Sequence, residues 1–235
     1  MSRADLGHWL RRAMLLALIV LAVFQAWYLC WIVYWRWYNP ADTAFMRHAL
    51  QTMETRNPSA RLQQQWVAYG RISGNLKRAV VAAEDARFLT HEGVDWEAME
   101  KAYELNLKRR RSARIHGGST ISQQVAKNLF LSSSRSYLRK AQELLITWMV
   151  EAVWNKKRIL EVYLNVAEWG DGVFGAQAAS RHYFGVDAAS LSPEQAAELA
   201  AMLPAPRLFD HHREAPFLSQ RSDSILRNLP SAQIP

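Results

Sequence analysis

The chain has 235 residues, half of them apolar, with 29 lysines and arginines against 21 acidic residues and a formal net charge of +8. This length accommodates one domain of about 200 residues and an appendage, and the 21% of charged and 11% of aromatic residues exclude a disordered chain. The single cysteine excludes a disulfide scaffold and a cysteine-based zinc site. The positive charge indicates an anionic partner, which could be nucleic acid, phospholipid or a phosphorylated substrate.

The positive charge is concentrated in two short segments. Residues 1–12 contain three arginines and one aspartate, and residues 101–115 contain six lysines and arginines and one glutamate. These segments carry net charges of +2 and +5, which leaves +1 for everything else. The protein is therefore nearly neutral outside two basic spots.

Residues 13–35 form an apolar segment without a formal charge. As a helix the segment is roughly 35 Å long, enough to cross a bilayer core, and tryptophans and tyrosines gather at its C-terminal end as in an interfacial belt. A cleaved signal peptide has a shorter apolar region that ends in small residues, and a buried core helix is rarely so long and uniformly apolar. We predict an uncleaved single-pass anchor, with residues 1–12 as a cytoplasmic tail because the arginines precede the span.

The sequence after the anchor predicts a linker and then a mostly α-helical domain. Residues 36–75 mix proline, glycine and polar residues, which is typical of a membrane-proximal linker with short helical pieces. Residues 76–235 show helical periodicity and little alternation. Helices are expected over 136–154, over 156–168, and from a Ser-Pro start signal at 192–193 to just before Pro204.

Glu84 is the first acidic residue in apolar company. At helical spacing it shares a stripe with Val80 and Phe88, one turn to either side. Burial raises the pKa of a carboxyl group toward values useful for proton transfer, so Glu84 is a candidate general base. The alternative is that Glu84 stands at a helix end and pairs with Arg87, a structural role that also perturbs acids.

Glu143 begins a polar row on a second helix. Residues 144–154 are apolar at nine of eleven positions, and the exceptions, Thr147 and Glu151, continue from Glu143 at intervals of four. Such a row must face a partner, water or a cleft, because a buried unpaired carboxylate is too costly. The basic residues at 139–140 offer ion pairing as the alternative.

Between these acids, residues 117–120 read Gly-Gly-Ser-Thr. If a helix follows over 120–131, its first backbone N–H groups form a favourable anion site, and Gln123 and Lys127 share a face. The spacing of a P-loop is absent. A plain helix N-terminus would have the same sequence.

Four motifs occur in order along the chain. They are Glu-Asp-x-x-Phe-x-x-His-x-Gly at 84–93, Gly-Gly-Ser-Thr-Ile-Ser-Gln-Gln with Lys-Asn-Leu at 117–129, Arg-Lys-x-x-Glu at 139–143, and Lys-Arg-Ile-Leu-Glu-x-Tyr-Leu-Asn at 157–165. Together they resemble the motifs of the peptidoglycan glycosyltransferases (glycosyltransferase family 51, the transglycosylase domain of penicillin-binding proteins). A fifth motif, Leu-Pro-Ala-Pro-Arg at 203–207, also resembles the family, and the residues after it depart from the family pattern.

The resemblance implies a lysozyme-like, two-lobed helical fold and a reaction. The reaction is the polymerisation of lipid II, a disaccharide-pentapeptide on undecaprenyl pyrophosphate, into β-1,4-linked glycan strands with inversion and release of undecaprenyl pyrophosphate. Glu84 would be the general base and Glu143 the second essential acid. The substrate-binding positions would be Asp85 beside the base, Ser119, Thr120, Gln123, Gln124, Lys127, Arg135, Arg139, Lys140 and Asn165, with Lys127 and Arg135 on the pyrophosphate.

The resemblance also implies a location and partners. The anchor would lie in the bacterial inner membrane and the domain in the periplasm, with lipid II, the glycan strand and cell-division or wall-synthesis proteins as partners, and no nucleic acid. No cofactor is required and a divalent cation is optional. No metal site is expected, because the histidines at 211–212 lack further ligands. The basic residues at 108–114 either contact anionic headgroups or pyrophosphate, or form a solvated loop.

Two other classes of protein fit part of the sequence. A lysozyme-like peptidoglycan hydrolase also uses a catalytic glutamate, but it has no pyrophosphate for Lys127 and Arg135 to hold. A membrane-anchored division scaffold or a nucleic-acid binder would use the basic patch alone, and would not need acids on buried helix faces.

Overall fold

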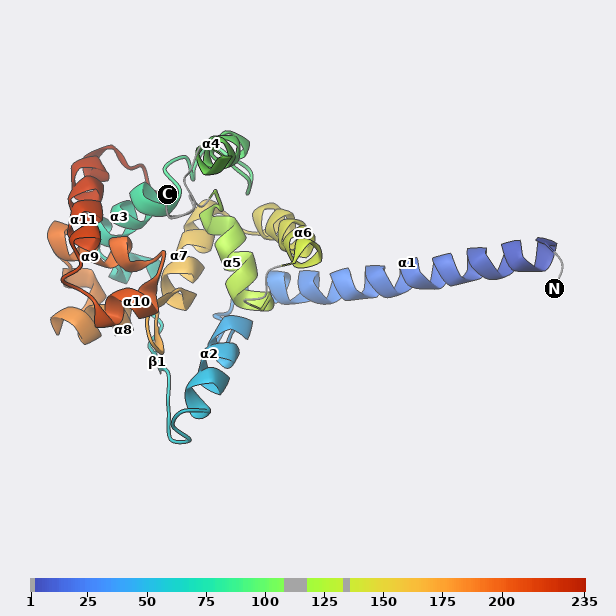
Figure 1. Cartoon of the computed structure of the whole chain (residues 1–235), viewed down its shortest axis with the longest axis horizontal. Helices are drawn as coiled ribbons and strands as arrows, with labels where there is room; N and C mark the ends of the chain where they lie inside the picture. Colours follow the sequence, from blue (N-terminus) through green and yellow to red (C-terminus); the bar gives the residue numbers. More distant parts are fainter. Residues whose placement is uncertain (1–2, 108–117, 133–135) are drawn as a thin grey trace. The chain divides into compact units, whose positions relative to one another are not determined.

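The computed structural model describes residues 3–107, 118–132 and 136–235. They fall into two units, one ending at Tyr38 and one running from Asn39 to Pro235. Helices make up most of both units (Figure 1). The predicted mostly α class is therefore confirmed.

The first unit contains one long helix, α1, from Arg3 to Tyr34. Its part Gly7–Tyr34 reaches a mean hydropathy of 2.3 and is, within the described ranges, the one helix long and apolar enough to cross a membrane. Most of its large apolar side chains are exposed, for example Leu16 at 62% and Val20 at 68%, although Tyr28 and Ile32 are buried. The core helix of a soluble protein buries most of such residues. The predicted anchor, 13–35, lies within α1 except for its last residue.

The segment predicted as a linker, 36–75, belongs from Asn39 onward to the second unit. It contains helix α2 (Ala44–Glu54), strand β1 (Gln63–Gln64) and the short 3-10 helix η1 (Tyr69–Arg71). The prolines of this segment therefore lie in irregular backbone that, from Asn39 onward, is part of the compact second unit.

The rest of the second unit is a helical domain with a small sheet. Its further elements are α3 (Gly74–Glu84), α4 (Trp96–Leu107), α5 (Ile121–Phe130), α6 (Tyr137–Val153), α7 (Lys156–Val166), β2 (Glu168–Gly170), β3 (Val173–Phe174), α8 (Ala176–Phe184), η2 (Ala188–Ser190), α9 (Pro193–Met202), α10 (Pro206–His211), α11 (Pro216–Asn228) and η3 (Leu229–Ser231). Helices α3 and α11 both pack on α9, and α5 packs against α6 and α7 (Figure 1). Strand β3 pairs in parallel with β1 and antiparallel with β2.

Several helices begin where the sequence provides a cap. Ser192 and Gln195 form a capping box at the start of α9, which confirms the predicted start. Helices α6 and α7 begin after Ser136 and Asn155, whose side chains each accept a hydrogen bond from a backbone N–H in the first turn. Helix α7 ends at Val166, earlier than predicted, because the next residues pair with β3 as strand β2.

Phe88 does not lie on the same helix as Glu84. Helix α3 ends at Glu84 and the chain then turns, so the predicted stripe is wrong at its last member. Phe88 is still completely buried, and the Lys156 ammonium lies 4.8 Å from its ring centre. Glu84 therefore occupies a helix C-terminus, where the helix dipole disfavours a negative charge.

Candidate active site

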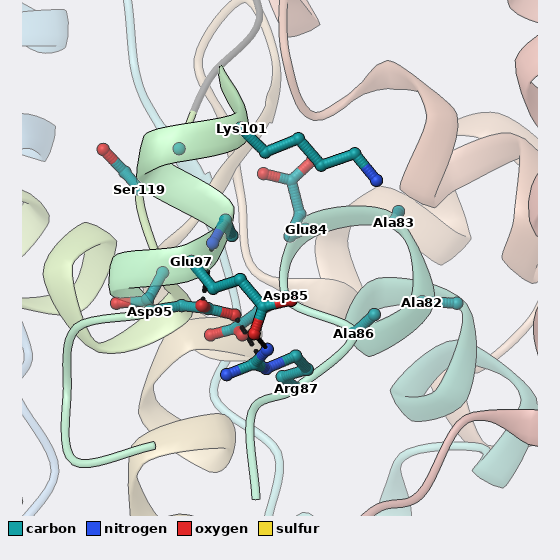
Figure 2. A pocket seen from close by; sticks show the side chains of 13 residues that line it. Ala82, Ala83, Glu84, Asp85, Ala86, Arg87, Asp95, Glu97, Lys101 and Ser119 are labelled. Atoms are coloured by element: carbon teal, nitrogen blue, oxygen red, sulfur yellow. Dashed lines mark hydrogen bonds and ion pairs between the residues drawn. The ribbon is translucent and has the colours of Figure 1, made fainter. Parts of the chain in front are cut away.

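The carboxylate of Glu84 is held by side chains from two other helices. Gln124 of α5 donates a hydrogen bond from Nε2 to Glu84 Oε2 over 2.9 Å, and Nη2 of Arg221 from α11 lies 3.3 Å from Oε1. The Glu84 side chain keeps 13% of its surface exposed and lines a pocket of about 330 Å³ (Figure 2). Glu84 is thus fixed at both oxygens and still borders open space.

The protein environment changes the proton affinity of Glu84. Burial raises the pKa of Glu84 above that of an ordinary carboxyl group, while the Gln124 hydrogen bond and the charges of Arg221 and Lys127 act against this rise. The neighbouring charge of Asp85 adds to it. A raised pKa makes Glu84 a stronger proton acceptor than an exposed glutamate, which is what a general base needs.

The alternative ion pair between Glu84 and Arg87 is not formed. Arg87 pairs with Asp95, over 3.4 Å from Nε to Oδ2, and with Glu97 (dashed lines in Figure 2). Asp95 also caps α4 by accepting a hydrogen bond from the Ala98 N–H over 2.9 Å. Arg87 therefore attaches the start of α4 to the turn after α3, and Glu84 is left to its other partners.

Asp85 connects the end of α3 to the start of α5. One carboxylate oxygen lies 2.9 Å from His91 Nε2, and the other accepts a hydrogen bond from the Ile121 N–H over 2.9 Å. His91 Nδ1 accepts a hydrogen bond from the Gly93 N–H, so the ring proton is on Nε2 and is donated to Asp85. This network places Asp85 as a support for the neighbouring base.

The start of α5, where the sequence predicts an anion site, is occupied by the carboxylate of Asp85. Thr120 and Gln123 complete the helix start as a capping box, and the Thr120 hydroxyl donates to the Gly93 carbonyl over 2.6 Å. Both side chains are buried, and Gln123 Nε2 has no partner among the described residues. Thr120 and Gln123 were predicted to contact the substrate, but their side-chain oxygens cap the start of α5. Sequence spacing alone could not distinguish this capping role from a ligand-binding role.

Replacing Asp85 by asparagine is expected to destabilise the domain by about 2–4 kcal/mol. The amide can still accept from the backbone of α5, but its NH₂ group then faces the His91 Nε2–H, donor against donor. If the ring changes tautomer, it loses the hydrogen bond from Gly93. Thermal unfolding measures the loss, and the exposed acid Asp42, replaced by asparagine, is the control. An Asp85→Asn chain as stable as the unmodified one would contradict the assigned hydrogen bonds.

Lys127 lies about one turn after Gln124 on α5 and borders a second pocket of about 190 Å³. Its ammonium lies 5.6 Å from the centre of the Phe45 ring. Burial lowers the pKa of Lys127, while the charges of Glu143 and Glu84 raise it. A partly desolvated cation beside open space is suited to an anionic group of a substrate.

Glu143 holds two further cations in place. Its buried carboxylate forms ion pairs with Arg139, over 2.5 Å from Nη1 to Oε2, and with Lys140, so the local pairing considered as the alternative is formed. Lys140 Nζ also lies 3.4 Å from Ser119 Oγ. Glu143 therefore orients cationic side chains close to the Gly-Gly-Ser-Thr segment.

The polar row on α6 faces α5 and its surroundings, as its composition requires. The Thr147 hydroxyl donates to the Glu143 carbonyl over 2.7 Å, and Glu151 accepts from Ser122 over 2.5 Å and from Lys156 over 2.7 Å. A Cβ atom on Gly93 would come within 2.8 Å of Thr147 Cγ2. Only glycine fits between the row and the turn after α3, where the backbone also has a φ of 88°.

Asn165 is completely buried and has a structural role. Its Oδ1 accepts from the Val67 N–H over 2.8 Å, and its Nδ2 donates to the carbonyls of Val67 and Glu161 over 2.9 and 2.8 Å. Both Nδ2 hydrogens are used and Oδ1 has a partner. The predicted contact between Asn165 and a sugar is therefore not what this geometry supports, because both polar atoms pair with other parts of the protein and the side chain is buried.

Two sets of predicted residues lie outside the described ranges. Arg135, expected on the pyrophosphate, is one of them, and the basic cluster at 108–114 is the other. Among the described residues, no group of three or more histidine, cysteine, aspartate or glutamate side chains could hold a metal ion.

The structure adds to the site three residues that the sequence analysis did not select. Lys101 of α4 lines the same pocket as Glu84 and extends toward the end of α3 (Figure 2). The Tyr163 hydroxyl donates to Gln124 Oε1 over 3.2 Å, and Arg221 contacts the base. Tyr163 is within a recognised motif and could have been selected, whereas Lys101 and Arg221 stand in no motif.

These features define a class of protein. A mostly helical domain presents a carboxylate of raised pKa beside pockets bordered by lysines. This arrangement is typical of an enzyme that removes a proton from an anionic substrate. A family model described as transglycosylase matches residues 49–230. The chain belongs to this family of glycosyltransferases, whose domain is lysozyme-like and helical, so the predicted family and fold are confirmed.

Relatives of nearly the same length support this assignment. Proteins named biosynthetic peptidoglycan transglycosylase from Nitrosomonas eutropha and Nitrosomonas europaea are 54% and 56% identical to the chain over 230 residues, covering 98% of the chain and 93% of each relative. The protein of that name from Dechloromonas aromatica is 53% identical over 230 residues, covering 98% of the chain and 99% of the relative.

Proposed function

We propose that the chain polymerises lipid II into β-1,4-linked glycan strands, with Glu84 as the general base. The observation that carries the proposal is the placement of Glu84, a braced carboxylate of raised pKa that borders open space. The family and the names of the relatives support the substrate class. Each cycle would release undecaprenyl pyrophosphate.

The chemistry balances with these groups. Glu84 takes the proton from the 4-hydroxyl of the acceptor sugar, and the oxygen attacks C1 of the donor sugar as the C1–oxygen bond to the pyrophosphate breaks. Attack on the face opposite the leaving group inverts the configuration at C1. The proton on Glu84 then passes to solvent, which restores the base for the next addition.

The cations stabilise the charge that develops on the leaving pyrophosphate. Lys127 borders the cleft, while Arg139 and Lys140 are oriented by Glu143, and such preorganised charges lower the barrier without reorganisation. Glu143 acts in this proposal by holding the two cations and not by proton transfer. Ser119, close to Lys140, is available to a sugar or phosphate oxygen.

The proposal includes a membrane topology. Helix α1 anchors the chain in the bacterial inner membrane, with the arginines of the N-terminal segment in the cytoplasm and the glycosyltransferase domain in the periplasm. A tether of this kind keeps the enzyme at the surface where its lipid-linked substrate diffuses. Cell-division or wall-synthesis proteins are proposed as further partners.

We propose that the reaction needs no organic cofactor, because the pyrophosphate is already an activated leaving group. A divalent cation is an optional addition that would act on the pyrophosphate oxygens of the substrate. Polymerisation that is unchanged by EDTA would support the cofactor-free form, and complete loss with recovery on adding Mg²⁺ would contradict it.

Purified full-length protein incubated with lipid II tests the function. Glycan polymer, absent when moenomycin is added, is the expected product. Release of soluble fragments from isolated sacculi, without polymer, would indicate a hydrolase instead. If neither product forms and the protein only binds membranes, the scaffold alternative is favoured.

A further inference from the structure

We propose that Arg221 and Tyr163 are positioning residues, which fix the Glu84 carboxylate in one orientation and keep it ionised between turnovers. This inference rests on the proposed role of Glu84 as the base. Arg221 of α11 contacts Glu84 directly, whereas Tyr163 of α7 contacts Gln124, which in turn binds Glu84.

Arg221 contacts the end of α3 at two points. Its Nη2 lies 3.3 Å from Glu84 Oε1 and 3.2 Å from the carbonyl oxygen of Ala83. A guanidinium that binds both a backbone carbonyl and a carboxylate holds the carboxylate relative to the helix end. Because α11 packs on α3 and α9, the position of Arg221 is set by the packing of three helices.

Tyr163 acts on the other oxygen of Glu84 through Gln124. A carboxylate can only accept hydrogen bonds, so the amide of Gln124 must present its NH₂ group to Glu84 and its oxygen to Tyr163. Tyr163 is 1% exposed, and burial, followed by the charges of Glu84 and Asp85, raises its pKa well above the usual value. Tyr163 therefore remains a hydroxyl donor, and its hydrogen bond to Oε1 helps to hold the amide in the orientation that Glu84 requires.

The charges around Glu84 explain why a cation is needed at this point. Asp85, the next residue after Glu84, disfavours the ionised form of Glu84, as burial does. Lys127 of α5 and Arg221 of α11 favour the ionised form. Lys101 of α4 lines the same pocket. Among the residues that the structure describes, Arg221 is the cation that forms an ion pair with the Glu84 carboxylate, so its removal should change the protonation of Glu84 most.

The direction of the effect follows from these charges. Without the Arg221 cation, Glu84 binds its proton more tightly, so the fraction of ionised base at a given pH falls. Activity that depends on ionised Glu84 is then lost at a higher pH on the acid side. The expected displacement is about one pH unit, the lower end of what an adjacent opposite charge produces.

The test compares the pH dependence of kcat/KM on lipid II for the full-length chain and three variants. Arg221→Gln should move the acid limb upward by about one pH unit, Arg221→Lys should restore most of it, and Arg227→Gln should leave it unchanged. Arg227 is exposed on the same helix, which makes it a matched control for the loss of one charge. An Arg221→Gln acid limb at the wild-type pH would overturn the charge role.

Tyr163→Phe tests the second half of the proposal. Without the hydroxyl, the Gln124 oxygen loses its partner and the amide that orients Glu84 is held less firmly. The kcat should therefore fall about tenfold, the equivalent of one hydrogen bond, while the KM for lipid II changes little. Equal kcat values for Tyr163→Phe and the unmodified chain would refute the positioning role.

A measurement without substrate separates this inference from the proposed function. ¹³C NMR of the full-length chain labelled at glutamate carboxyl carbons reports the titration of Glu84, identified by the signal that Glu84→Gln removes. An upward shift of that titration in Arg221→Gln supports the inference even if lipid II is not polymerised. An unshifted titration overturns it even if the unmodified chain is an active polymerase.

Discussion

The Glu84→Gln variant is expected to polymerise lipid II about 10²–10⁴-fold more slowly than the unmodified chain, because it has lost its general base. Glutamine has nearly the same shape and can still accept from Gln124 through its side-chain oxygen. It cannot take a proton from the acceptor hydroxyl. Initial rates of polymer formation measure the loss, and a rate within tenfold of the unmodified chain would exclude Glu84 as the base.

The pH dependence adds a second test of Glu84. Its pKa is raised by burial, so activity should fall with decreasing pH through a value above the usual glutamate pKa of about 4.3. Below that pH the carboxyl group is protonated and can no longer take the proton of the acceptor hydroxyl. The residual rate of Glu84→Gln should lack this acid limb, which distinguishes loss of the base from a general loss of structure.

Folding stability should change little in the same variant. A raised pKa means that the ionised form is disfavoured by the fold, so removing the charge relieves a cost at neutral pH. The loss of the contact with Arg221 offsets part of that relief. Thermal unfolding at pH 7 should therefore show a melting temperature close to that of the unmodified chain, and retained lipid II binding would confirm an intact cleft.

The Lys127→Met variant should lose about 10²–10³-fold in kcat/KM while the fold keeps or gains stability. Methionine has a similar length without the charge, so stabilisation of the leaving pyrophosphate is lost. Burial lowers the pKa of Lys127, which shows that the fold holds this cation at a cost that methionine removes. Steady-state rates and thermal unfolding on the same samples measure both effects.

The exposed residue Arg61, replaced by methionine, is the control for Lys127→Met because it also removes one positive charge. It should leave kcat/KM unchanged. A Lys127→Met chain that keeps its activity would place the pyrophosphate elsewhere. A chain that loses activity only because it unfolds would show a large drop in melting temperature, and this would contradict a primarily functional role for Lys127.

The pH dependence of Lys127 has the opposite sign from that of Glu84. Because its pKa is lowered, the ammonium loses its proton at a lower pH than an exposed lysine, and the affinity for an anionic leaving group falls as pH rises through that value. The basic limb of the activity profile should therefore begin below the usual lysine pKa of about 10.4. It should disappear in Lys127→Met.

The sequence alone determined the features that depend on local interactions. The apolar run that forms α1, the capping box at Ser192 and the polar row on α6 follow from the order of neighbouring residues. These patterns are reliable because a helix is formed by contacts three or four residues apart and its ends are closed by adjacent side chains. The four motifs also located the candidate base, although not its partners.

Tertiary structure alone decided which polar groups meet. Asp85 reaches the start of α5 across 36 residues, Asn165 holds Val67 across 98, and Arg221 reaches Glu84 across 137. These pairs form because packed helices bring distant segments within hydrogen-bond distance, and no local spacing encodes that approach. The sequence therefore predicts a buried acid at Glu84. Only the packing of α3, α5, α7 and α11 shows which side chains bind its carboxylate and which charges change its pKa.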